Sequence, residues 1–144
     1  MRLIAKIATI ALAVVATVAV AAAATDPHAK ARQQLMDTIG MNMKVLGDMA
    51  GGKATFDAAG AKAAQAAIVA ASTEIPAKFE TQSSDPKSKA KPELWANFAD
   101  FKKDAGALNA AATALDVASV ETLQAGISAV GGVCKDCHTE YRSE

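Results

Sequence analysis

The chain has 144 residues, of which 51% are hydrophobic, and it carries 15 basic and 15 acidic side chains. This balance excludes the strongly basic surface that nucleic-acid-binding proteins need, and the length suits one domain with a single core. Only two cysteines are present, and both lie in one short motif near the C-terminus.

The first 24 residues have the pattern of a secretory signal. A basic start precedes an apolar run over residues 7–20, and Ala22 and Ala24 form an A-x-A cleavage site. The alternative, an uncleaved membrane anchor, would need a longer apolar span of about twenty residues with less alanine. We therefore predict a cleaved signal peptide over 1–24 and a periplasmic domain over 25–144. Cleavage leaves 13 basic against 15 acidic side chains, a formal charge of −2.

The mature region is rich in alanine and lacks alternating β-branched residues, which favours helices. A first helix is predicted from about Pro27 to Met49. Asp26 is its expected N-cap, Pro27 its first residue, and Gly51-Gly52 its stop. The inward stripe has spacings of 4, 3, 4 and 3 and consists of Arg32, Met36, Ile39, Met43 and Leu46.

A second helix is predicted to start near Thr55, which can cap it, and to continue to about Thr73. Its pattern is weak because alanine fits either face of a helix. Ile75-Pro76 is expected to break the periodicity, and the polar segment from there to Lys91 is expected to be a long connection.

Two further helices are predicted, one from Pro92 to Leu115 and one from Asp116 or Ser119 to Tyr141. Apolar residues recur at alternating spacings of 4 and 3 in both, which is typical of bundle packing. In the last helix these residues are Val120, Leu123, Ile127, Val130, Cys134, Cys137 and Tyr141. The sequence therefore predicts an all-α domain of four helices with both cysteines on its inner side.

The most specific motif is Cys134-Lys135-Asp136-Cys137-His138. Two thiols three apart, followed at once by an imidazole, are what covalent attachment of a c-type haem requires. Each sulfur adds to one vinyl group of the porphyrin, and the histidine gives a neutral imidazole nitrogen to the iron. On a helix, positions 134, 137 and 138 project from one side. The motif predicts one covalent haem c with its iron.

Two other chemistries use a pair of cysteines at this spacing. A dithiol redox pair is expected in a βαβ context, and a structural zinc site needs four ligands from cysteine and histidine. Apart from the motif, the chain has only His28 as a further histidine, near the new N-terminus. Haem attachment is therefore the preferred interpretation.

A secreted helical chain with CxxCH almost at its C-terminus resembles the class II cytochromes c, the family of cytochrome c′ and its low-spin relatives of the c-556 type. The resemblance covers the mature region. It rests on Arg32-Gln33, on Phe56-Asp57-Ala58-Ala59, on Pro92-x-x-Trp95 and on Cys134 to Arg142. It implies an antiparallel four-helix bundle that encloses the haem.

The resemblance also implies roles for two residues of the first helix. In the family, the residue opposite the iron-binding histidine follows an arginine by one helical turn, which here is Met36. Five-coordinate cytochromes c′ have a hydrophobic residue there, whereas the low-spin branch has a methionine that binds iron and raises the reduction potential. From periodicity alone, Met36 is equally a flexible core residue, and Met43 is the next candidate ligand. Arg32 is expected to pair with a haem propionate, the alternative being a solvated arginine.

The predicted function is transfer of single electrons between periplasmic redox partner proteins, with His138 and Met36 as axial ligands. The alternative is a five-coordinate cytochrome c′ that binds nitric oxide or carbon monoxide at an open sixth site. Catalysis is not expected, because no general acid or base constellation surrounds the motif. Neither nucleic acid nor, after cleavage, a membrane is an expected partner. Family members often dimerise through their first two helices, but this second helix shows no clear self-complementary patch, so a homodimer is left open.

Overall fold

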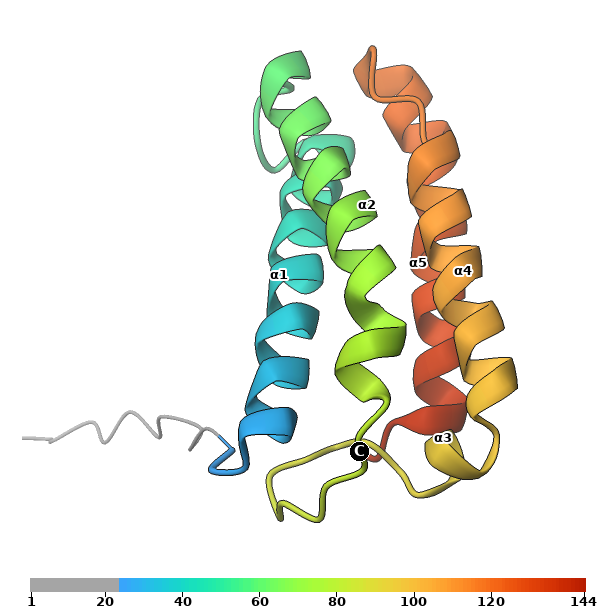
Figure 1. The fold of residues 1–144 in the computed structure, drawn as a ribbon. Helices are drawn as coiled ribbons and strands as arrows, with labels where there is room; N and C mark the ends of the chain where they lie inside the picture. Colours follow the sequence, from blue (N-terminus) through green and yellow to red (C-terminus); the bar gives the residue numbers. More distant parts are fainter. Residues whose placement is uncertain (1–23) are drawn as a thin grey trace, which may run out of the picture.

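The computed structural model describes residues 24–144, so the predicted signal peptide, apart from Ala24, lies outside the described residues. The helices of this part are α1 (Pro27–Ala50), α2 (Ala58–Phe79), α3 (Glu93–Ala96), α4 (Phe98–Ala114) and α5 (Val120–Tyr141). The four long helices run alternately up and down (Figure 1). The predicted antiparallel four-helix bundle is confirmed.

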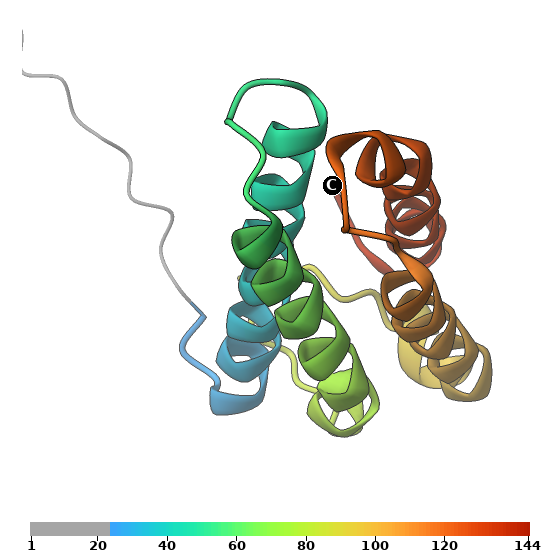
Figure 2. The ribbon, with the colours of Figure 1, turned by 90° about the horizontal axis from the view of Figure 1, so that it is seen from above.

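Each long helix packs against two others, in the cyclic order α1, α2, α4 and α5. Figure 2 shows the four helices end-on as two neighbouring pairs, α1 beside α2 and α4 beside α5. The core between them includes the fully buried side chains of Leu46, Ile68, Leu94, Leu123 and Val130. Within residues 24–144, none of the helices combines the length and the apolar character that crossing a membrane requires.

Helix α1 begins and ends as its sequence predicts. The Asp26 carboxylate accepts a hydrogen bond from the backbone N–H of Ala29 at 2.8 Å, and Pro27 is the first helical residue. After Ala50 the chain leaves the helix through Gly52, whose φ of +69° is a conformation that favours glycine.

Helix α2 differs from the prediction at both ends. Its N-cap is Asp57 instead of Thr55, because the Asp57 carboxylate accepts hydrogen bonds from two free N–H groups of the first turn. The helix also continues through Pro76 to Phe79, so the break predicted at Ile75-Pro76 is wrong. Burial of Ile75 and Phe79 in the core holds the last turn even though Pro76 cannot donate a backbone hydrogen bond.

The third predicted helix is interrupted. Asn97 leaves helical geometry with φ of −115° and ψ of 36°, so that the short α3 precedes α4. Two tertiary contacts fix α3 in place: Leu94 is buried, and the indole N–H of Trp95 donates to the backbone oxygen of Phe79 at 2.8 Å. The periodicity of the sequence predicts the inward position of Leu94 but carries no information about the bond from Trp95 to Phe79.

Helix α5 begins at a capping box in which Ser119 and Thr122 bond each other's backbone N–H groups. At its other end the chain pairs with the connection between α2 and α3. The N–H of Lys91 donates to the oxygen of Tyr141 at 2.9 Å, and the N–H of Ser143 donates to that of Lys89 at 2.8 Å. The C-terminus, the connection and the start of α1 therefore meet at one end of the bundle (Figure 1).

Candidate functional site

A cavity of about 740 Å³ opens at this end of the bundle, which is a usual size for a small-molecule site. Each of the four long helices contributes to its wall, together with α3 and residues 86–90 of the connection. Aromatic rings cover part of the wall. Phe101 lies 5.1 Å from Phe79 and 5.5 Å from Tyr141, measured between ring centroids.

The motif residues of α5 meet the cavity on one side. Cys137 and His138 line it, while Cys134, one turn earlier, packs partly buried against the core. No disulfide joins the two cysteines. Positions 134, 137 and 138 belong to one continuous helix, as the sequence predicts.

The cysteine thiols are in apolar surroundings. Burial raises the pKa of Cys134, and it raises the pKa of Cys137 to about 12 with further contributions from Asp104, Cys134 and Glu140. Reactive dithiol pairs need a lowered thiol pKa, because the thiolate is the nucleophile. These surroundings therefore disfavour the dithiol redox alternative.

The imidazole of His138 suits a metal ligand. Partial removal of the ring from water lowers the pKa of His138, and the positive charge of Arg142 lowers it further. A lowered pKa favours the neutral ring, which is the form that binds a metal.

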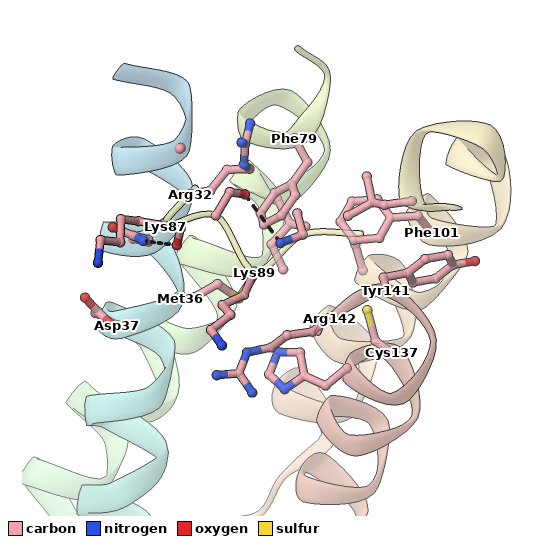
Figure 3. A pocket seen from close by; sticks show the side chains of 18 of the residues that line it. Arg32, Met36, Asp37, Phe79, Lys87, Lys89, Phe101, Cys137, Tyr141 and Arg142 are labelled. Atoms are coloured by element: carbon pink, nitrogen blue, oxygen red, sulfur yellow. Dashed lines mark hydrogen bonds between the residues drawn. The ribbon is translucent and has the colours of Figure 1, made fainter. Parts of the chain in front are cut away.

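Met36 lines the cavity from α1. Figure 3 shows Met36 and Cys137 on different sides of the cavity, one from α1 and one from α5. Met43, which shares the inward stripe of α1, packs against the core and does not line the cavity. His28 is exposed and also lies outside the lining.

Arg32 is a buried cation beside the cavity, with 3% of its surface exposed. Its guanidinium donates to the backbone oxygen of Thr81 at 2.9 Å and to Oγ of Ser83 at 2.6 Å. It also lies 5.6 Å from the ring centroid of Phe79 and 5.4 Å from that of Trp95. The alternative of a solvated arginine is therefore wrong.

The charge of Arg32 is not neutralised by direct contact. Among residues 24–144 no carboxylate lies within ion-pair distance of its guanidinium, although Asp26 and Asp85 act on it from further away. Burial lowers the pKa of Arg32, as expected for a cation removed from water. A guanidinium has five N–H donors, so it retains donors for an anion inside the cavity.

Sequence reasoning missed two parts of the wall. Phe79 fell in the predicted connection, although its spacing from Ile68, Ser72 and Ile75 continues the helical pattern and could have identified it. Residues 86–90 carry no local signal, since tertiary hydrogen bonds and the packing of Ala90 against the core bring them to the cavity. One of these is the bond from the Gln33 side-chain amide to the oxygen of Lys87 at 2.9 Å, shown in Figure 3.

These features fit a flat, largely apolar group with anionic substituents and a metal centre, as a haem has. The aromatic wall suits the ring, the guanidinium suits a carboxylate, and the imidazole of His138 and the thioether of Met36 suit iron.

Comparison with known proteins agrees with this description. The sequence model of the cytochrome c′ family matches residues 27–142. Cytochrome c′ of Rhodopseudomonas palustris is 35% identical over 142 residues, which cover 96% of this chain and 97% of that protein. Cytochrome c-556 of Agrobacterium fabrum is 36% identical over 115 residues, 77% of each protein.

A solved structure shows the same fold. It is the nitric oxide complex of a leucine-to-isoleucine variant of cytochrome c′ from Alcaligenes xylosoxidans. It superposes with a TM-score of 0.71 at 28% identity, over 81% of this chain and 94% of that one. The expected resemblance is thereby confirmed: the chain belongs to the cytochrome c′ family, whose cofactor is haem c with its iron.

Proposed function

We propose that this protein is a periplasmic electron carrier with a six-coordinate, low-spin haem. In this proposal the segment 1–24 is removed on export, Cys134 and Cys137 attach the haem, and His138 and Met36 bind its iron from opposite faces. The proposal rests on the position of Met36. Of the two methionines in the inward stripe of α1, Met36 lines the cavity and Met43 does not.

Bound iron supplies the chemistry by changing between its ferrous and ferric states. A thioether ligand opposite an imidazole favours the ferrous state and raises the reduction potential. The neutral imidazole of His138 and the uncharged thioether of Met36 add no charge to the centre. Two fixed ligands on packed helices also limit the structural change between the two states, as electron transfer requires.

Arg32 is proposed to bind one haem propionate. Its two bonds to residues 81 and 83 hold the guanidinium at the cavity wall, and its remaining donors suit a carboxylate. The same contacts would give the haem one fixed orientation in the cavity.

The ligand assignment is tested by replacing Met36 with alanine in holoprotein matured in the periplasm. The expected result is loss of the weak far-red band of iron–methionine ligation and conversion of the iron from low-spin to high-spin, measured by visible absorption. Met43→Ala is the matched control and should keep the low-spin spectrum. An unchanged spectrum in the Met36 variant would make Met36 a core residue.

The alternative function is binding of nitric oxide or carbon monoxide at an open sixth site. It is favoured by the solved relative of the same fold, which was obtained as a nitric oxide complex. Rapid binding of carbon monoxide by the ferrous wild-type protein, together with a high-spin ferric spectrum, would support this function and exclude the carrier. We propose no enzymatic reaction, and we expect redox proteins of the periplasm as partners.

A further inference from the structure

Asp85 forms a binding site for the start of the mature chain. It lies in the connection between α2 and α3 and is 9% exposed. Its Oδ2 accepts hydrogen bonds from the N–H of Thr25 at 2.7 Å, from Oγ1 of Thr25 at 3.0 Å and from the N–H of Asp26 at 2.8 Å. Its Oδ1 accepts from the N–H of Lys87 at 2.7 Å. Four donors thus converge on one carboxylate.

None of these four donors carries a charge in the unprocessed chain. Within residues 24–144 no cation forms an ion pair with Asp85. Arg32 is near enough to be influenced by it, but the bonds of its guanidinium go to Thr81 and Ser83. The carboxylate of Asp85 is thus held by hydrogen bonds from uncharged donors alone. A positive charge on one of these donors would add a charge-assisted hydrogen bond to this part of the structure.

Thr25 is the residue to which signal cleavage would give such a charge. Hydrolysis of the Ala24–Thr25 peptide bond by a peptidase consumes one water, leaves a carboxylate on Ala24 and frees the amine of Thr25, which takes up a proton at neutral pH. We propose that this new ammonium group forms an ion pair with Asp85 that anchors the α2–α3 connection at the haem cavity. This inference rests on the cleavage site of the proposed function.

The anchor has a direct path to the cavity. Lys87, which donates to the other oxygen of Asp85, belongs to the wall segment 86–90. Ala24 is itself buried, and its N–H donates to the side chain of Gln33 at 3.1 Å. Burial of Ala24 shields the Ala24–Thr25 peptide bond once this part of the chain has folded, so we expect cleavage to come before folding here.

The ion pair has a defined pH dependence. The titratable groups near it are the carboxylate of Asp26, the imidazole of His28 beside Asp26, and the guanidinium of Arg32, while Lys87 contacts Asp85 through its backbone N–H. Asp85 should raise the pKa of the Thr25 amino group above its usual value of about 8. The resulting stability is fully present below about pH 8 and is lost as the pH rises through the raised pKa.

The test begins with the intact mass of the holoprotein, which should give Thr25 as the first residue. The pH titration of the Thr25 resonances is then compared in the wild type and in Asp85→Asn. We expect a raised amino pKa in the wild type and a return to the ordinary value in the variant. Equal pKa values in the two proteins would overturn the inference.

A second variant leaves Asp85 untouched. A serine inserted between Ala24 and Thr25 moves the ammonium group by one residue and restores an uncharged N–H at Thr25. Its thermal midpoint at neutral pH should fall by about 3–5 °C, and this loss should be absent when Asp85 is asparagine. A midpoint equal to that of the wild type would overturn the inference.

The two proposals fail in different ways. A first residue other than Thr25 overturns the processing and the anchor together, while the haem spectrum remains that of a carrier. A haem spectrum that excludes the carrier leaves the mass and the Thr25 titration unaffected.

Discussion

Arg32 combines two tasks, because its side chain both closes the end of the bundle and borders the cavity. A lysine at this position would keep the charge but lose the planar group between two aromatic rings and the pair of bonds to residues 81 and 83. We expect Arg32→Lys to lower the free energy of unfolding by about 1–3 kcal/mol, measured by denaturant unfolding of the holoprotein. Lys30→Ala, at an exposed position of the same helix, should change it by less than about 0.5 kcal/mol. Equal effects of the two variants would contradict this account of Arg32.

The carboxylate of Asp85 makes stability sensitive to acid. Hydrogen bonds from the backbone, that of Asp26 first and that of Lys87 next, lower the pKa of Asp85 from 3.8 to about 2. A lowered pKa gives stability that is present above the ordinary value and lost as the pH falls through about 2. The difference in thermal midpoint between wild type and Asp85→Asn should therefore be full at about pH 5 and shrink towards about pH 2. A difference that stays constant over this range would show that the charge of Asp85 plays no part.

One glycine inside α1 and one just after its end should respond to alanine in opposite directions. Gly47 lies inside the helix with nothing within 4 Å of an added Cβ, whereas Gly52 has a φ of +69° just beyond the end. Gly47→Ala should stabilise the protein by about 0.5–1 kcal/mol, and Gly52→Ala should destabilise it by about 1–2 kcal/mol. Thermal unfolding of both variants measures whether each substitution raises or lowers the stability. Destabilisation by Gly47→Ala would mean that its surroundings are not open.

The helices show how far local signals reach. The bounds of α1 could be predicted closely because they depend on local effects. Asp26, Pro27 and Gly52 act on backbone groups only a few residues away. The continuation of α2 through Pro76 and the interruption at Asn97 could not be predicted, because distant packing partners decide both. In α2, burial of the turn that contains Pro76 outweighs the local preference of proline against helix.

The candidate site could be predicted only in part, because some of its residues follow local patterns and others depend on distant contacts. Cys137, His138 and Met36 were identified from spacing and family resemblance, and all three border the cavity. The inward position of Arg32 follows from the spacing of the α1 stripe, but its bonds to residues 81 and 83 depend on where a long connection folds back. Roles that act through the haem itself stay predictions.

The whole molecule should depend on the group that fills its cavity. Without the haem, a cavity of about 740 Å³ bordered by the four long helices would forfeit packing contacts along its walls. We expect Cys134→Ser/Cys137→Ser, which cannot hold the haem covalently, to show a lower thermal midpoint and a less cooperative transition by circular dichroism. The single variant Cys134→Ser, with one attachment left, should fall between it and the wild type. A haem-free variant as stable as the wild type would mean that the helices repack around the cavity with no loss of stability.

The attachment motif occupies residues 134–138 of a chain of 144. Translation proceeds from the amino end, so the residues of α1, α2 and α4 are synthesised before those proposed to hold the haem. A polypeptide that terminates early therefore never becomes coloured. On this proposal, haem absorbance counts only chains that were synthesised through the last turns of α5 and then loaded with haem, so the ratio of absorbance to total protein measures the yield of finished holoprotein.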